Sequence, residues 1–225
     1  MDADLSPAAE QHLPYSLSQG HGPGKRASPA DACCGALYIM RNPLDVAISY
    51  ANHSDVTIDR SIEMMANPQG AFCRTRKGQA NQLRQQLLSW SGHVLSWADA
   101  PDLHLRIVRY EDMRLDPLPT FTATAKFLHL PHDQQKVEDA LAKCDFALLK
   151  EQEEQGNFKE RPANAPCFFR KGVAGDWQER LTKEQVDRII EDHGEVMQRF
   201  GYLDAAGQPL HPPGPLPEQG QGEAI

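Results

Sequence analysis

A five-residue apolar run, Ala36–Met40, leads directly into the start signal of a helix. A short and almost fully apolar run suits a strand of a parallel sheet, because both faces of such a strand are covered. Asn42 is a good N-cap, Pro43 is favoured at the first helical position, and Asp45 adds negative charge to the first turn. We therefore expect a helix over residues 43–53 that follows the strand directly.

Further along the chain, one more strand and four helices are expected. The strand covers residues 103–108, where apolar and polar side chains alternate. The helices carry apolar residues at helical spacing and cover residues 79–98, 119–130, 133–150 and 183–200. The last helix opens with Thr182 and Gln185, the pattern of a capping box. This order of elements predicts an α/β fold with a parallel sheet flanked by helices.

Both ends of the 225-residue chain differ in composition from its middle. Residues 1–31 hold Pro, Gly, Ser and scattered His without apolar periodicity, and residues 204–225 are rich in Pro and Gly. Such segments bury too little apolar surface to form a core. We expect a disordered or non-native-like extension over residues 1–34, one domain over residues 35–203, and a disordered tail after it.

Charge and composition exclude several classes of partner. The net charge of −8 argues against non-specific nucleic-acid binding, which requires a basic face. No run approaches the roughly 18 apolar residues of a membrane span. The five cysteines contain no CxxC pair, which fits a reducing compartment, and His129 and His132 have no further ligand at metal-binding spacing. We expect a cytoplasmic protein with no metal, no nucleic-acid partner and no membrane.

Arg41 and Ser49 form a first candidate anion site. Arg41 follows the first strand, at the edge where open α/β sheets bind ligands. Ser49 lies about two turns into the next helix, on a face that can look back toward the end of the strand. A guanidinium and a hydroxyl that converge there would suit one phosphate. Spacing alone favours the alternative, in which both side chains face solvent.

A second candidate anion site begins at Arg170 and Lys171, which precede Gly172. Cations next to glycines allow an anion to approach the backbone amides closely, although an ordinary basic turn is the favoured alternative. Tyr110 follows the second strand and could line a base-binding pocket, and Phe146 could stack on a planar ligand. Each of these aromatic residues is more often a core side chain.

Three stretches together resemble the cytosolic sulfotransferase family. RNPLDVAISY, VRYEDM and RKGVAGDWQERLT occur in the order and separation found in that family, in which RKGxxGDW is a diagnostic motif. The resemblance covers residues 35–203 and implies a P-loop-NTPase-like parallel sheet flanked by helices. It also implies 3'-phosphoadenosine 5'-phosphosulfate (PAPS) as co-substrate and transfer of its sulfuryl group to a hydroxyl or amine of a small acceptor.

The resemblance implies roles for individual residues but identifies no catalytic residue. The residues that correspond to the family's 3'-phosphate contacts are Arg41, Ser49, Arg170, Lys171 and Gly172. Those that correspond to its adenine contacts are Tyr110 and Phe146. The sequence leaves open whether the chain forms a homodimer, because residues 181–184 resemble the dimerisation segment of the family only loosely.

Two catalytic features of the family have no counterpart in this sequence. One is the PKSGTTW-type loop that cradles the 5'-phosphosulfate, and the other is the KTH-type strand end that supplies the general-base His. His12, His21 and His53 all lie in other contexts. We therefore expect a fold that lacks its first strand and phosphate-binding loop, as in an N-terminally truncated or altered member produced by a frameshift or an alternative start.

The sequence leaves two functions open. One is sulfuryl transfer from PAPS, against which the absent loop and general base argue. The other is a non-catalytic remnant that binds the nucleotide or a partner subunit. A relative of the P-loop nucleotide kinases is excluded, because the chain has no GxxxxGK[ST] loop. No motif identifies the acceptor.

Overall fold

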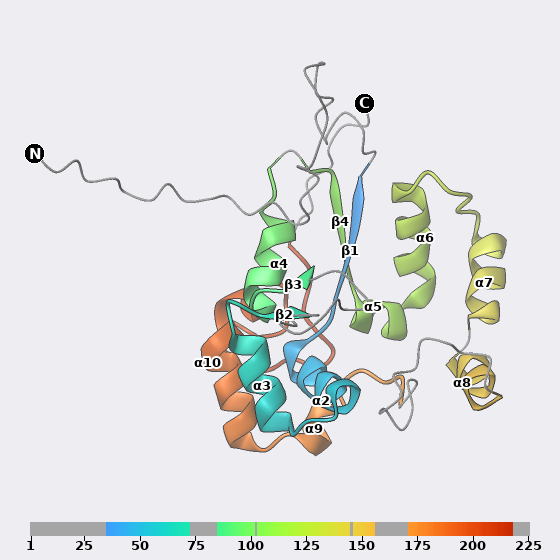
Figure 1. The fold of residues 1–225 in the computed structure, drawn as a ribbon. Helices are drawn as coiled ribbons and strands as arrows, with labels where there is room; N and C mark the ends of the chain where they lie inside the picture. Colours follow the sequence, from blue (N-terminus) through green and yellow to red (C-terminus); the bar gives the residue numbers. More distant parts are fainter. Residues whose placement is uncertain (1–34, 73–84, 102, 145, 156–170, 218–225) are drawn as a thin grey trace, which may run out of the picture.

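A parallel pair of strands lies at the centre of the fold (Figure 1). Strand β1, Ala36–Met40, pairs with strand β4, Leu105–Arg109, so that the first residues of the two strands face each other and so do the last. This arrangement confirms the predicted parallel sheet. The structure is a computed structural model, and it describes residues 35–72, 85–101, 103–144, 146–155 and 171–217.

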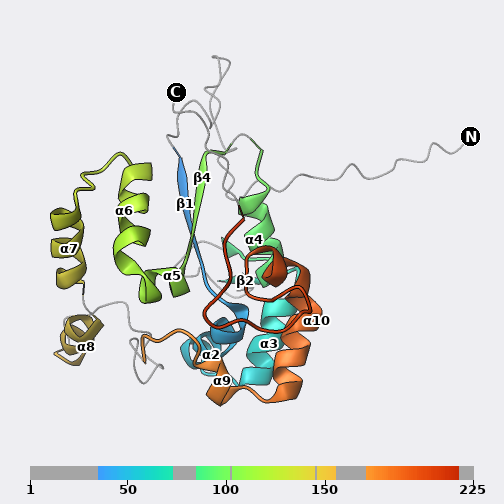
Figure 2. The ribbon, with the colours of Figure 1, turned by 180° about the vertical axis from the view of Figure 1, so that it is seen from behind.

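Helices lie on both sides of the strand pair (Figures 1 and 2). The described helices are α2 Pro43–Ser54, α3 Ile58–Ala66, α4 Trp90–Ala98, α5 Tyr110–Leu115, α6 Pro117–Phe127, α7 Gln134–Lys143, α8 Phe146–Glu154, α9 Trp177–Arg180 and α10 Lys183–Arg199. Helices α3, α4 and α10 lie on one side of the strands, and α6 and α7 lie on the other. None of the described helices is long and apolar enough to cross a membrane.

Two helices begin where the capping residues predict. The Asn42 side chain accepts a hydrogen bond from the Leu44 amide at 3.0 Å, which starts α2 directly after β1. Thr182 and Gln185 form the predicted capping box at the start of α10. Because these caps need only neighbouring residues, the sequence is sufficient to locate both helix starts.

The helix predicted over residues 79–98 is wrong in its first part. Helix α4 begins at Trp90, because the Ser89 side chain accepts from the Gly92 amide and Leu88 has a left-handed backbone with φ of +61°. Residues 85 and 86 form a short strand, β3 Gln85–Gln86, which pairs with β2 Ala71–Phe72. The part of the prediction over residues 79–84 lies outside the described residues.

Other boundaries also differ from the sequence-based expectation. The helix predicted over residues 133–150 is two helices, with Cys144 as the C-cap of the first. Helix α3 was not predicted, although Thr57 caps it by accepting from the Arg60 amide. Its buried Ile62 and Met65 lie on the apolar face of a nine-residue helix, which is shorter than the roughly 11 residues over which helical periodicity is usually counted.

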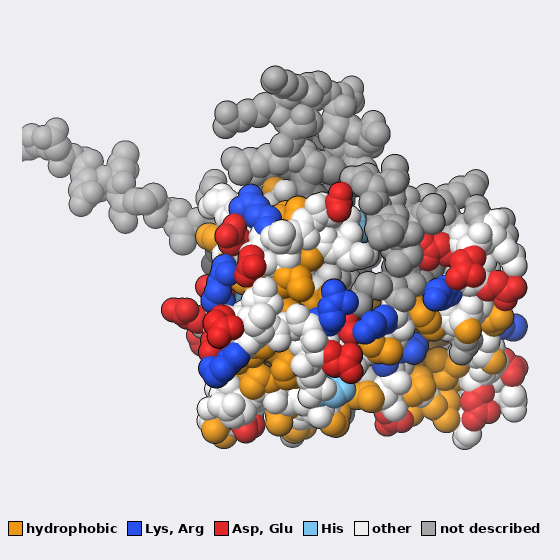
Figure 3. Space-filling model, turned by 90° about the horizontal axis from the view of Figure 1, so that it is seen from below, with side chains coloured by type: hydrophobic (Ala, Val, Ile, Leu, Met, Phe, Trp, Pro, Cys, Tyr) orange, Lys and Arg blue, Asp and Glu red, His pale blue; other side chains and the backbone are white. Residues whose placement is uncertain are grey.

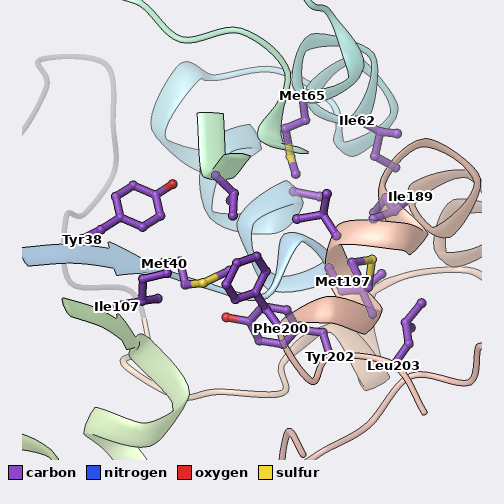
Figure 4. Packing of buried hydrophobic residues seen from close by; sticks show 14 residues of the cluster. Tyr38, Met40, Ile62, Met65, Ile107, Ile189, Met197, Phe200, Tyr202 and Leu203 are labelled. Carbon is purple, nitrogen blue, oxygen red and sulfur yellow. The ribbon is translucent and has the colours of Figure 1, made fainter. Parts of the chain in front are cut away.

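The hydrophobic core joins β1 to the C-terminal part of the domain (Figure 4). Its buried members come from both central strands, from α2, α3, α4 and α10, and from the residues that follow α10: Tyr38, Met40, Leu44, Ala47, Ile62, Met65, Val94, Ile107, Ile189, Val196, Met197, Phe200, Tyr202 and Leu203. The core therefore fixes the position of the β1–α2 junction, where Arg41 lies.

Residues 204–217 are ordered, in contrast to the disordered tail that their composition predicts. The Gly214 amide donates to the Gly201 carbonyl at 2.7 Å, and the Gly214 carbonyl accepts from Arg109 Nη1 at 2.6 Å. Hydrogen bonds to the backbone and to a buried guanidinium thus order a segment that has few apolar side chains to bury. Residues 218–225 lie outside the described residues.

Arg109 anchors this segment from the end of β4. Its side chain is buried, and it makes a two-point ion pair with Asp112, at 2.8 and 2.9 Å. Its Nη1 group also donates to the carbonyls of Phe200, at 2.9 Å, and Gly214. One guanidinium therefore connects β4, α5 and the chain beyond α10.

Glu111 forms a second buried polar contact close to Arg109. It is 1% exposed and accepts from the Asn42 amide at 2.9 Å and from the Tyr202 hydroxyl at 3.1 Å. Burial raises the pKa of the Glu111 carboxyl above its usual value. Glu111 thereby links the start of α2 to α5 and to the residues after α10.

Two histidines, His93 partly buried and His193 3% exposed, are expected to make the stability of the fold sensitive to acid. His93 Nδ1 lies 2.8 Å from the Tyr38 hydroxyl, and His193 Nδ1 lies 2.9 Å from the Ser91 hydroxyl. Burial lowers the pKa of both imidazoles. The unfolded state therefore binds more protons than the folded state once the pH falls below about 6.5.

We expect the free energy of unfolding to fall as the pH is lowered from about 7.5 to about 5.5, within the range in which unfolded histidine titrates. The measurement is urea denaturation of the wild type and of a His93→Gln/His193→Gln variant at both pH values. The variant should lose most of this pH dependence, and an equal dependence in the two proteins would contradict the assignment.

Candidate functional site

The site begins where β1 and β4 end. Arg41 follows β1, and Tyr110 follows β4. Since the strands are parallel and in register, their carboxyl ends meet at one edge. The Arg41 guanidinium lies over the Tyr110 ring, 4.3 Å from its centroid. Two predicted site residues from distant parts of the chain are thus in direct contact.

The loop that starts at Lys171 reaches the same edge. Arg41 Nη2 donates to the Val173 carbonyl at 3.0 Å, and the Asp45 carboxylate accepts from the amides of Gly175 and Trp177. The loop is therefore attached at two places, to Arg41 just before α2 and to Asp45 within α2. Figure 3 looks onto this edge, where one group of Lys and Arg side chains lies near the middle of the face beside an acidic side chain, and further basic and acidic side chains lie toward its sides.

Lys171 is held within this loop. Its Nζ lies 2.6 Å from the carboxylate of Asp176, which is 5% exposed, whereas the Lys171 side chain is 44% exposed. A buried carboxylate thus orients an ammonium group that solvent can still reach. Such a group can meet an anion with little loss of side-chain freedom.

Gly172 and Phe146 are also neighbours. Gly172 has a left-handed backbone with φ of +63°, and a Cβ at this position would lie 2.5 Å from Phe146 Cδ2. The Arg114 guanidinium lies 5.7 Å from the centroid of the Phe146 ring. Only glycine allows this close approach of the ring to the loop, so the structure joins both residues to the site.

One predicted site residue that the structure describes is not joined to this cluster. The Ser49 side chain is exposed on α2 and makes no hydrogen bond with other described residues. Arg170 lies outside the described residues. The parts of the chain that the structure describes also hold no group of three His, Cys, Asp or Glu side chains that could bind a metal.

The arrangement agrees with a comparison against known protein families. The family described as "Sulfotransferase domain" matches residues 10–201 of the chain. The chain belongs to the sulfotransferase family. The motifs place the start of the resemblance at residue 35, and the family match begins upstream of it. It confirms the family to which these motifs pointed.

Two curated relatives show how much of a sulfotransferase the chain covers. It is 28% identical to cytosolic sulfotransferase 17 of Arabidopsis thaliana over 207 residues, which are 86% of this chain and 56% of that protein. It is 27% identical to flavonol 3-sulfotransferase of Flaveria bidentis over 168 residues, which are 69% of this chain and 52% of that protein. The chain thus spans about half the length of these relatives.

A solved structure supports the fold of this family member. A mouse sulfotransferase complexed with PAP superimposes with a TM-score of 0.55 at 24% sequence identity, covering 77% of this chain and 61% of that one. At this identity the likeness concerns the fold, and it agrees with the parallel sheet and flanking helices of this sulfotransferase-family chain.

Sequence reasoning missed how the two halves of the site are joined. Asp45 was noted only as a negative charge in the first turn of α2, yet it binds the loop 130 residues away. Arg114 was not singled out. The i,i+4 spacing of Arg41 and Asp45 is a local signal for the contact between them, but nothing local indicates that backbone amides far along the chain complete it.

The Gly172–Phe146 contact gives a stability test in this sulfotransferase-family chain. Gly207 also has a positive φ, of +78°, but a Cβ there would meet no other atom within 4 Å. We expect Gly207→Ala to cost about 1–2 kcal/mol of unfolding free energy, from backbone strain alone. Gly172→Ala should cost about 2–3 kcal/mol, since the ring must also move. Chemical denaturation measures both, and equal costs would contradict the contact.

Proposed function

We propose that this chain binds the 3'-phosphoadenosine nucleotide at the carboxyl edge of β1 and β4, and uses PAPS to transfer a sulfuryl group to a hydroxyl or amine of a small acceptor. The observation that carries the proposal is the Arg41–Val173 hydrogen bond of 3.0 Å. It places a guanidinium beside the loop that presents Lys171. Two cations and a glycine backbone then face one edge, as a dianionic phosphate requires.

The individual contacts follow from this placement. Arg41, Lys171 and the Gly172 amide would bind the 3'-phosphate, together with Ser49 and Arg170 as the family resemblance implies. The Nε atom of Arg41 is buried and has no hydrogen-bond partner among the described residues, so the guanidinium retains donor capacity. The proposed adenine contacts are Tyr110, against which Arg41 already stacks, and Phe146.

The proposed reaction exchanges one bond to sulfur for another. The acceptor oxygen or nitrogen attacks the sulfur of PAPS while the bond from sulfur to the bridging phosphate oxygen breaks. The acceptor releases its proton to solvent, and adenosine 3',5'-bisphosphate (PAP) leaves with the electron pair of the broken bond between sulfur and oxygen. The residues named above bind and orient the nucleotide, and no catalytic base is assigned. We propose no metal for this reaction.

A second candidate function is nucleotide binding without turnover. The sequence favours it because neither a PKSGTTW-type loop nor a KTH-type strand end occurs in the chain. These groups supply proton transfer and charge stabilisation, which typically accelerate a reaction by about 10²–10⁴-fold and by at least 10²-fold respectively. Besides the nucleotide, the proposed ligand of such a non-catalytic chain is a partner subunit. A second copy of this chain is one such partner.

The two candidates differ in one assay. Calorimetry with PAP tests binding, and radiolabelled PAPS with a panel of phenols, alcohols and amines tests transfer. Binding together with labelled acceptor supports sulfuryl transfer. Binding without any labelled acceptor selects the non-catalytic function, and the absence of PAP binding would overturn both.

The remaining proposals concern the cell and the domain. We propose that the protein is cytoplasmic, because its cysteines lack a disulfide pattern and a relative is named a cytosolic sulfotransferase. The proposed domain runs from residue 35 to residue 217, since the hydrogen bonds of Gly214 attach the segment after residue 203 to the core.

A further inference from the structure

We infer that Asp45 is a positioning residue of the nucleotide site. Its carboxylate holds the loop of residues 171–176 against Arg41. The inference rests on the proposed function, because it concerns the site that binds the 3'-phosphate. Asp45 itself is 1% exposed, so we assign it no direct contact with the nucleotide. It acts through the two segments that it joins.

Both oxygens of the Asp45 carboxylate are in use. Oδ1 accepts from the Trp177 amide at 3.0 Å, and Oδ2 accepts from the Gly175 amide at 2.8 Å. Oδ2 also lies 3.4 Å from Arg41 Nη2. A single buried side chain thus contacts the phosphate-binding Arg and the end of the loop that carries Lys171 and Gly172.

The two amides determine where the Lys171 ammonium of the loop lies. They flank Asp176, whose carboxylate holds the Lys171 ammonium at 2.6 Å. Gly175 has a positive φ of +86°, so the backbone turns sharply at this point. If the amides lost their acceptor, the loop would keep the Val173 hydrogen bond to Arg41 and the contact of Gly172 with Phe146, but it would lose both of these hydrogen bonds to α2.

Electrostatics and positioning predict opposite effects of removing the charge of Asp45. The carboxylate lies beside Arg41 and weakens the attraction of the site for anions. On charge alone, Asp45→Asn should therefore bind a phosphate more tightly. If Asp45 positions the loop, the variant should bind it more weakly, because an amide oxygen replaces only one of the two acceptors.

The test compares two nucleotides that differ only in the 3'-phosphate. Calorimetry gives the dissociation constants of PAP and of adenosine 5'-phosphate for the wild type, for Asp45→Asn, and for Asp59→Asn. The last is a matched control, because Asp59 is exposed and pairs with Arg188 on the surface. We expect Asp45→Asn to weaken PAP binding about tenfold at unchanged stoichiometry, with adenosine 5'-phosphate unaffected.

The outcomes separate a failure of the proposed function from a failure of the role of Asp45. A wild type that does not prefer PAP overturns the proposed function. A wild type that prefers PAP, with Asp45→Asn binding PAP equally or more tightly, overturns the role of Asp45 alone. An equal loss for both nucleotides, or a fall in stoichiometry, indicates general loss of structure and also overturns it.

A measurement on the wild type covers the case in which Asp45→Asn does not fold. Hydrogen exchange should show the amides of Gly175 and Trp177 protected in the free protein and more protected with PAP. The amide of Ala36, which donates to the His104 carbonyl at the opposite, amino end of the strand pair, should not respond to PAP. Unprotected amides at Gly175 and Trp177, or no response to PAP, would overturn the inference.

Discussion

Replacing Arg41 with alanine should weaken PAP binding by about 10- to 100-fold, the equivalent of about 1.5–3 kcal/mol for a charge-assisted hydrogen bond. Among the described residues of the proposed site, Arg41 contacts both Tyr110 and the loop after Lys171, with its guanidinium over the Tyr110 ring and its Nη2 group on the Val173 carbonyl. Its removal therefore takes away a phosphate donor and also the contact that orders its neighbours.

Arg60→Ala provides the matched control for Arg41→Ala. Arg60 lies on α3, pairs with Glu63 at 2.8 Å and is 62% exposed in its side chain, so its loss should leave PAP affinity within about twofold. Arg41→Lys tests geometry, because lysine keeps the charge but loses the planar fork and the stack on Tyr110. It should recover only part of the affinity. Calorimetric binding of Arg41→Ala at the wild-type level would refute the proposed phosphate site.

Replacing Arg109 with methionine should lower the free energy of unfolding by about 3–5 kcal/mol, the usual cost of removing one partner from a buried ion pair. The Asp112 carboxylate and the carbonyls of Phe200 and Gly214 would all lose a donor. In a domain of this size such a loss lowers the melting temperature by about 6–20 °C. Thermal and urea denaturation together measure the effect.

Arg199→Ala separates burial from charge in this comparison. Arg199 pairs with Asp99 at 2.6 Å, but both side chains are exposed, so the substitution should cost less than about 1 kcal/mol. A loss of similar size in Arg109→Met and Arg199→Ala would show that the guanidinium of Arg109 does not hold the end of the domain in place.

The β1–α2 unit could be predicted from the sequence because its signals are local. An apolar run, an N-cap Asn and a Pro at the first helical position all lie within eight residues of Ala36, and the structure reproduces each of them. The sequence also places Arg41 and Tyr110 directly after the two strands, but their contact is known only from the structure, in which the parallel strands bring their carboxyl ends to one edge.

Features that depend on distant partners could not be predicted. The order of the segment around Gly214 requires Arg109, and the attachment of the loop at Gly175 requires Asp45. In both cases a buried charged side chain from one part of the chain binds the backbone of another. Composition records neither partner, so Pro and Gly in residues 204–217 suggested disorder where the structure has hydrogen bonds.

The closing of the core by Phe200 and Tyr202 has a consequence for the synthesis of the protein. Both side chains are fully buried against residues that are made much earlier, and Arg109 obtains its last acceptor only at Gly214. During translation, the apolar faces of β1 and α2 therefore remain uncovered until Phe200 and Tyr202 have been made. We expect the domain to fold only after residue 214 has emerged, with earlier nascent chains dependent on chaperones.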